Sequence, residues 1–251
     1  MIAMSRIAIF FLAGFVFLLA LLLSAPASLL NPMLASTSIV SHTHIRGSVW
    51  SGVIENLSAE GVFLGRARYK LRPLSLLLAK PSFALTLSGG AVSGHGNFAV
   101  SRDSIAINGG AFRVSLGDIT SSQALGMPVR GRADIDVASL HFNKNGCQRA
   151  SGTISTDFLN GTAEEFGASG FVLAGPADCD GDDLRIKLAG EGDEGSANVV
   201  LLVKPNLTYS MEAMASPTRS EVATALSFLG FEATGTGLNY QVVGRLSQIG
   251  S

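Results

Sequence analysis

Charge is scarce in this chain of 251 residues: Asp, Glu, Lys and Arg together make up 15%, and the formal net charge is −1. A nucleic-acid-binding protein needs a basic patch or stripe to neutralise phosphates. This composition therefore argues against a nucleic-acid partner. Only two cysteines are present. Two thiolates cannot complete a structural zinc site alone, and no histidine has the spacing to join them. A zinc domain is therefore excluded as well.

Catalytic and cofactor motifs are absent too. The sequence has no G-x-S-x-G elbow for a nucleophilic serine, no phosphate-binding loop and no dinucleotide fingerprint. His42 and His44 could supply half of a metal site, but no Cys, Asp or Glu follows at ligand spacing, which favours a solvated linker. The acidic group Asp180, Asp182 and Asp183 lacks the closing Glu of a calcium loop, which favours a solvated turn. We therefore expect a non-enzymatic protein with no cofactor and no metal.

One long apolar run is present near the N-terminus, where Ile7–Leu23 follows Arg6 without a charged residue. As a helix it would span about 25 Å, close to the hydrocarbon thickness of a bilayer. Its length favours a retained membrane anchor, whereas Ala25–Ala27 offers the small-residue site of a cleaved signal peptide. In either case Arg6 stays inside and the rest is exported. The predicted organisation is an anchor over 1–30, a linker over 31–46 and an exported β-rich domain over 47–251.

Both cysteines, Cys147 and Cys179, fall in the exported part of the chain. An oxidising compartment would pair them in a disulfide, and two separate buried thiols are the alternative. A disulfide here would close a loop of about 32 residues and stabilise the fold by roughly 3–4 kcal/mol in the chain-entropy estimate.

Glycine is abundant, with 29 residues, and together with many Ser, Thr and Val it favours turns and strands over helices. From Gly47 onward apolar and polar residues alternate, as in strands with one wet face. One such strand has Phe63, Ala67, Tyr69 and Leu71 on one face and Arg66, Arg68 and Lys70 on the other. A second has Val129, Ala133, Ile135 and Val137 opposite Arg130, Arg132, Asp134 and Asp136.

Further strands are predicted at 83–87, 98–100, 105–107, 112–116, 184–188, 197–203, 207–211 and 238–246. Turn signals separate several of these runs: Gly89-Gly90, Gly109-Gly110 and Asn145-Gly146. Strands this regular, joined by turns rather than long helices, predict a mainly β fold. The expected architecture is a curved or twisted antiparallel sheet or meander.

Two helical segments interrupt this pattern. Leu74–Leu78 follows a proline and is too short for more than one or two turns. A better helix is predicted over 219–229, with Thr218 as N-cap, Glu221 completing a capping box and Gly230 ending it in the left-handed conformation. One face of that helix is apolar, formed by Val222, Leu226 and Leu229.

Two segments carry a family resemblance: Gly47–Gly52 reads GSVWSG, and Leu64–Leu78 reads LGRARYKLRPLSLLL. They resemble the start of the periplasmic region in protein N of the bacterial type II secretion system. The central segment from Cys147 to Gly181 agrees, and so does the end, where Leu229-Gly230 precedes the strand LNYQVVGRL. Tyr69 stands where that family's strand often carries tryptophan. The resemblance covers nearly the whole chain.

The resemblance implies a single-pass inner-membrane protein whose main domain is periplasmic, acting without a cofactor as an accessory or assembly component of type II secretion. Its partners would be other secretion subunits, either the secretin or the inner-membrane platform. Charged outer faces of strands are then candidate contacts, because exposed charge governs association rate and partner choice. They are Arg66, Arg68, Lys70, Arg130 and Arg132. A merely solvated strand face is the alternative for each cluster.

The strand–proline–leucine opening also resembles AsmA-like proteins, which are large inner-membrane-anchored β-proteins linked to lipid traffic. This second resemblance implies a protein that offers an apolar sheet face to lipid acyl chains. Both families share a long curved sheet, so the fold alone cannot separate them. A sheet closed over its own side chains would favour a scaffold, whereas an open, dry groove would favour a lipid carrier. The chain is short for a sheet that bridges two membranes alone.

Overall fold

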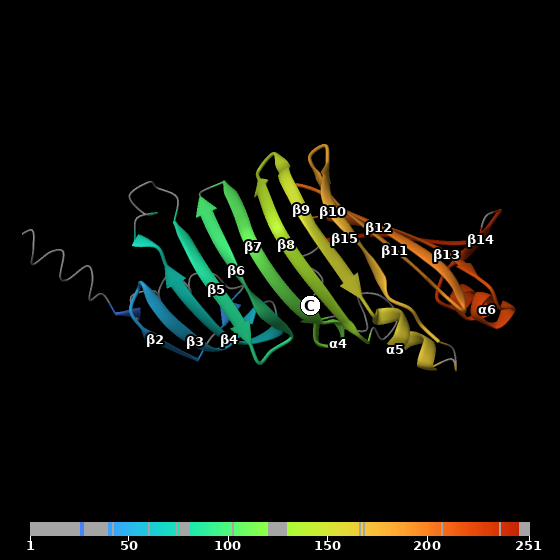
Figure 1. The fold of residues 1–251 in the computed structure, drawn as a ribbon, viewed down its shortest axis with the longest axis horizontal. Helices are drawn as coiled ribbons and strands as arrows, with labels where there is room; N and C mark the ends of the chain where they lie inside the picture. Colours follow the sequence, from blue (N-terminus) through green and yellow to red (C-terminus); the bar gives the residue numbers. More distant parts are fainter. Residues whose placement is uncertain are drawn as a thin grey trace, which may run out of the picture.

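A single antiparallel sheet of 15 strands forms the fold in the computed structural model of the chain. The structure describes residues 26–27, 40–41, 43–59, 61–73, 75, 81–101, 103–119, 130–165, 167, 169–206, 208–235 and 237–245. From β3 to β13 each strand pairs with the next one in sequence, and β15 then lies between β13 and β14. Figure 1 shows the strands side by side in one long row. The prediction of a mainly β antiparallel meander is confirmed.

The sheet begins with β1 (Val40–Ser41) and β2 (His44–Gly47), which both pair with β3 (Ser51–Ala59). Paired strands thus start N-terminal to Gly47. The remaining strands are β4 (Val62–Leu71), β5 (Ser82–Ser88), β6 (Val92–Ser101), β7 (Ser104–Ser115), β8 (Arg132–Asn143), β9 (Gly146–Thr156), β10 (Leu173–Asp180), β11 (Asp183–Gly192), β12 (Gly195–Val203), β13 (Thr208–Pro217), β14 (Glu232–Thr234) and β15 (Gly237–Arg245).

The predicted membrane anchor, residues 1–30, lies outside the described residues except for Pro26 and Ala27. Within the ranges that the structure describes, no helix has both the length and the apolar character needed to span a bilayer. The predicted short helix at Leu74–Leu78 also lies outside the described residues, apart from Ser75.

The predicted turn at Gly109-Gly110 is wrong, because both glycines lie inside β7. The register between β6 and β7 shifts at this point, so β7 carries an extra residue. Gly109 has a φ of +70°, which glycine adopts without a Cβ clash, and the pair forms a β-bulge instead of a turn. The two predicted strands on either side are therefore one strand. Gly89-Gly90 and Asn145-Gly146 do lie at hairpin turns.

The predicted apolar face of β4 is interrupted near its start. Ala67 is buried at 1% exposure, as the alternation predicts, but Phe63 is 48% exposed. Gly65 lies between them with a φ of +76°, outside the extended region, and the register with β3 shifts beside it. A strand that changes twist at such a point no longer keeps residues two apart on one face.

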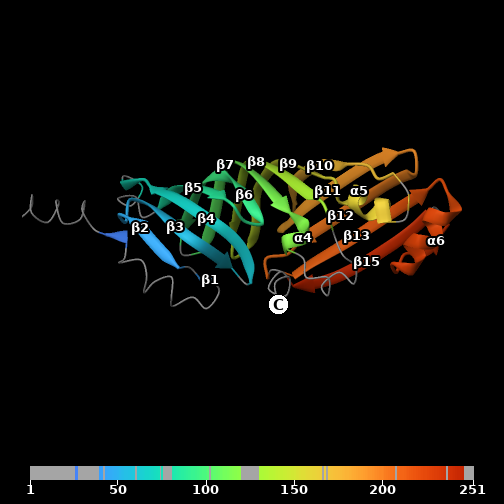
Figure 2. The ribbon, with the colours of Figure 1, turned by 90° about the horizontal axis from the view of Figure 1, so that it is seen from below.

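The sheet curls along its length. Seen from below in Figure 2, the strands at both ends bend toward the same side, with β7 to β9 set back between them. In agreement, the short helix α4 (Leu116–Ile119), which follows β7, contacts β4 three strands away in the sheet. Curling of this kind comes from the strand twist and is increased by bulges.

The two longer helices are α5 (Phe158–Glu165) and α6 (Ser220–Phe228). The predicted C-terminal helix is thus present, and Gly230 follows it with a φ of +92°, as expected. The predicted N-cap at Thr218 is wrong: the N-cap is Arg219, which makes no side-chain capping bond. Thr218 instead donates its backbone N–H to the carbonyl of Glu194 at 2.9 Å, which holds it against the β11–β12 turn.

Few side chains are fully buried, because one sheet layer is covered only by short helices. Among the described residues, Leu173 is the one large side chain with 0% exposure. The other buried apolar residues are small or lie near strand ends: Ala27, Ala67, Ala91, Ala133, Cys147, Val203, Ala213 and Leu238. Because so little of the core is enclosed, part of the apolar surface between the sheet and the helices stays accessible.

Candidate functional site: an apolar groove

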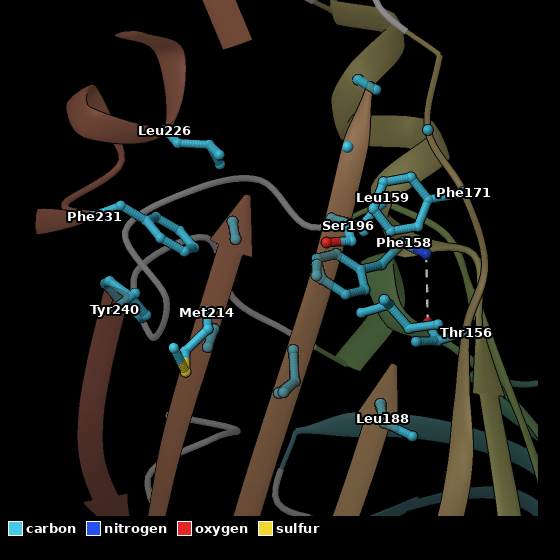
Figure 3. A pocket seen from close by; sticks show the side chains of 18 of the residues that line it. Thr156, Phe158, Leu159, Phe171, Leu188, Ser196, Met214, Leu226, Phe231 and Tyr240 are labelled. Carbon is cyan, nitrogen blue, oxygen red and sulfur yellow. Dashed lines mark hydrogen bonds between the residues drawn. The ribbon is translucent and has the colours of Figure 1, made fainter. Parts of the chain in front are cut away.

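An apolar groove of about 420 Å³ runs over the sheet face that α4, α5 and α6 cover. β8 to β13 and β15 form its floor, and α5 and α6 form its walls. Figure 3 shows Phe158 and Phe171 on one side, with Leu226 and Phe231 on the other. Its volume is in the range of roughly 300–1,000 Å³ that is typical of ligand sites. Among the described lining residues, Glu194 is the only charged one.

Alternation along the strands builds the floor. In β12 the alternate residues Gly195, Ala197, Val199 and Leu201 line the groove, together with Ser196 near the start of the strand. The antiparallel register then aligns these with residues of the neighbouring strands, so that Ile186, Leu201 and Met211 are successive neighbours from β11 to β13. Because cross-strand neighbours share a face, each such row forms a continuous apolar rib across the sheet.

Small residues create the space above the floor. Gly190, Ala197 and Ala215 are cross-strand neighbours on three successive strands. A Cβ at Gly190 or Gly192 would lie 3.0 Å from the ring of Phe171, so these glycines allow the ring to lie close to β11. Larger side chains in this row would fill the groove and displace the ring.

The walls place the apolar faces of the helices opposite one another. Val222 and Leu226 of α6 and its C-cap residue Leu229 all line the groove, as the helical spacing predicts. Phe231, just after α6, stacks on Tyr240 of β15 with ring centroids 5.2 Å apart. This contact ties the end of α6 to the sheet and fixes one wall.

Two of the polar residues in the groove, Thr156 and Glu194, form hydrogen bonds to other parts of the chain. The Thr156 hydroxyl donates to the carbonyl of Arg132 at 2.9 Å and accepts the backbone N–H of Phe158 at 3.4 Å. Glu194 accepts a hydrogen bond from Arg219 through Oε1 at 3.0 Å. Its second oxygen, Oε2, is buried without a hydrogen-bond partner in the described part of the chain. Ser169, Ser196 and Tyr240 also line the groove, and their hydroxyls can offer hydrogen bonds to a ligand.

Most of the side chains in the lining are apolar. Its hydroxyls have no His, Lys or Cys beside them among the described lining residues. In the described ranges, no group of three or more His, Cys, Asp or Glu side chains could hold a metal ion. A concave apolar surface binds a ligand chiefly by removing apolar area from water.

The predicted partner contacts lie on two separate strands: Arg66, Arg68 and Lys70 on β4, and Arg130 and Arg132 at or just before the start of β8. All five are exposed. Arg66 lies 4.0 Å from Glu55, and Arg132 lies 3.5 Å from Asp157 beside the groove. Because β4 and β8 are four strands apart in the sheet, the two clusters form two surfaces.

The predicted pair Cys147–Cys179 is present as a disulfide between β9 and β10. Cys147 is 4% exposed, and its N–H donates to the carbonyl of Asp182 in the β10–β11 turn at 2.7 Å. The disulfide thus joins the start of β9 to the end of β10, next to the β10–β11 turn.

Arg185 of β11 forms ion pairs with two acidic residues of β10, across the same hairpin. It binds Asp178 through two hydrogen bonds of 2.9 and 3.0 Å, and Asp180 at 2.6 Å. The hydrogen bond from Arg185 is the main reason that the pKa of Asp178 lies below its ordinary value, despite a smaller opposing effect of burial. The acidic group considered as a weak calcium site is therefore partly engaged by a guanidinium.

We expect the Asp178–Arg185 contact to lose its stabilising effect at low pH. The pKa of Asp178 is lower in the folded than in the unfolded protein. The contact therefore contributes its full stability above the unfolded pKa, and it loses this contribution as the pH falls through the folded pKa. The contribution should be below about 1 kcal/mol, since Asp178 is 45% exposed. Urea unfolding of the wild type and Asp178→Asn should differ at pH 7 and converge once the pH falls below the folded pKa of Asp178. A difference that persists at low pH would contradict this explanation.

Sequence reasoning missed α5, which supplies Phe158, Leu159 and Ala163 to the groove. Thr156-Asp157 before it is a recognisable N-cap signal, and the Thr156 hydroxyl does accept a hydrogen bond there. Gly161 within the helix weakens that signal, because glycine disfavours helix interiors. The structure explains the glycine: a Cβ there would lie 2.9 Å from Cβ of Arg130.

Comparison with known families gives one result. A sequence profile of the family described as type II secretion system (T2SS), protein N, matches residues 39–239. No curated protein and no solved structure matches the chain. The matched region runs from just before β1 to within β15 and includes the described residues that line the groove, apart from Tyr240. The chain therefore belongs to the type II secretion system protein N family.

Proposed function

We propose that this protein is a non-catalytic accessory and assembly component of a bacterial type II secretion apparatus. It is held at the inner membrane by residues 1–30, and its β-rich domain lies in the periplasm. The family match over residues 39–239 carries this proposal. The apolar run Ile7–Leu23 after Arg6 supports the anchor and the orientation. The disulfide supports an oxidising compartment.

The cluster of Arg66, Arg68 and Lys70 is the proposed contact with another secretion subunit. The three side chains are exposed on one strand, and only Arg66 lies near an acidic partner, Glu55, among the pairs described. Such a row of cations suits an acidic surface of the secretin or of the inner-membrane platform.

Reversing these three charges to Glu should weaken capture of secretin or platform subunits by about tenfold, as expected for three exposed pairs of roughly 0.5 kcal/mol each. The measurement is affinity purification of the full-length protein from crosslinked membranes, with the captured subunits quantified. A matched control reverses Lys144, Arg149 and Lys187, which are exposed elsewhere. Equal capture by the two variants would reject the β4 cluster as the contact, and no capture by the wild type would reject the assembly role.

A further inference from the structure

A second, smaller pocket of about 140 Å³ lies at the end of β4, away from the groove. Its lining includes Arg72 just after β4, Ser82 and Phe83 of β5, Asn97 and Phe98 of β6, and Asn108 of β7. We propose that this pocket binds the carboxylate of an acidic side chain, Asp or Glu, on the secretion subunit that the β4 cluster contacts. The inference deepens the proposed function and rests on it for the source of the carboxylate.

The charge of the surrounding segment favours an anionic ligand. Residues 61–102 contain six Lys or Arg residues and no Asp or Glu, although the whole chain has a net charge of −1. Arg72 continues the alternation of the β4 cluster, so it extends the row of cations to the pocket. In the described part of the chain its guanidinium pairs with no carboxylate: Nη2 donates to the neutral Oδ1 of Asn97 at 3.2 Å. The carboxylate that would neutralise Arg72 is therefore expected from another molecule.

Hydrogen bonds of the backbone fix the position of Arg72. Its N–H donates to the carbonyl of Ser82 at 2.9 Å, and its carbonyl accepts from the Ser75 hydroxyl at 2.6 Å. The same hydroxyl accepts the N–H of Ser82 at 2.9 Å. Because this part of the backbone is already ordered, a ligand has to immobilise only the side chain of Arg72.

The β-bulge between β6 and β7 brings two further donors to the pocket. The register shifts between Gly96 and Phe98, so that Asn97 lies opposite the extra residue of β7, beside Asn108. A bulge redirects the side chains of the residues that form it. Since Oδ1 of Asn97 accepts from Arg72, its Nδ2 can donate to a ligand, and the amide of Asn108 can do the same. A guanidinium and two amides together suit both oxygens of a carboxylate.

The apolar part of the lining favours an acidic side chain over the phosphate of a lipid. Phe83 and Phe98 stack with ring centroids 5.6 Å apart and line the pocket beside the donors. The methylene groups of an Asp or Glu side chain can pack on these rings while the planar carboxylate binds the guanidinium. A phospholipid phosphate carries polar glycerol and headgroup atoms on both sides, and these would lose water against the rings.

The test measures binding of a fluorescent peptide, in which Glu alternates with Thr, to the full-length protein in detergent. Alternate residues of an extended chain lie about 6.8 Å apart, which matches the spacing of the cations along β4. Arg72→Gln should weaken the affinity by about tenfold, because a hydrogen-bonded ion pair is lost. Arg149→Gln is the matched control, since it removes the same charge from an exposed position on β9 and should bind like the wild type.

Two other variants locate the bound carboxylate. Asn97→Asp places a carboxylate beside Arg72, so it should weaken peptide binding as much as Arg72→Gln does. Arg72→Lys supplies an amine, which a carbodiimide joins to a carboxylate in direct contact with it. After this treatment mass spectrometry should find the peptide attached at position 72.

Several results would overturn the proposal: no peptide binding by the wild type, equal affinity of Arg72→Gln and the wild type, or no attachment at position 72. Binding of phosphatidylglycerol vesicles that Arg72→Gln abolishes, without binding of the peptide, would overturn it in favour of a membrane contact. Circular dichroism checks that each variant is folded. The peptide test uses no secretion subunit, so the pocket can fail while subunit capture through the β4 cluster succeeds, and the reverse.

Discussion

Replacing both Cys147 and Cys179 by Ala should lower the free energy of unfolding by about 3–4 kcal/mol. The disulfide joins β9 to β10 with a sequence separation of 32, and it therefore removes much of the freedom of this segment in the unfolded chain. The same segment includes α5 and Leu173, so the loss reaches the groove. Urea unfolding of the full-length protein in detergent, followed by circular dichroism, measures the change.

Reduction provides the control for this prediction. A reducing agent should destabilise the wild type by a similar amount and leave the double Ala variant unchanged. On a non-reducing gel the wild type should migrate faster than its reduced form, and each single Ala variant should lack that difference. Two thiols that react freely with an alkylating agent in the native, oxidised protein would contradict the prediction.

Local patterns predicted the strands well, because the alternation that places Ala197, Val199 and Leu201 on one face is a property of consecutive residues. Prediction from local patterns failed where one sequence motif is compatible with two different structures. Gly109-Gly110 allows either a hairpin turn or a bulge, and only pairing with β6 decides between them. The capping signal at Thr218 was overridden in a similar way by its hydrogen bond to Glu194.

The groove could not be predicted, because it depends on contacts between distant parts of the chain. Its floor follows from the register of seven strands, and its walls come from helices more than fifty residues apart, α5 and α6. The apolar face of α6 was visible in the sequence, but not the surface that it faces. Likewise the exposure of Arg132 followed from alternation, whereas its pairing with Asp157 required the fold of β8 against β9.

Leu173→Ala should be the most damaging single substitution of a groove residue, with a loss of about 2–5 kcal/mol. Leu173 is 0% exposed and begins β10, where it is the cross-strand neighbour of the buried Thr156. A Cβ on Gly190 would lie 3.0 Å from its side chain, so both adjacent strands contact it. Removing the side chain leaves a cavity that the sheet cannot close, because the strands are held in register by their backbone hydrogen bonds.

The matched control is Val243→Ala on β15, which is 78% exposed and should change stability by less than about 0.5 kcal/mol. Urea unfolding of both full-length variants gives the comparison, and a Leu173→Ala midpoint equal to that of Val243→Ala would contradict the burial seen here.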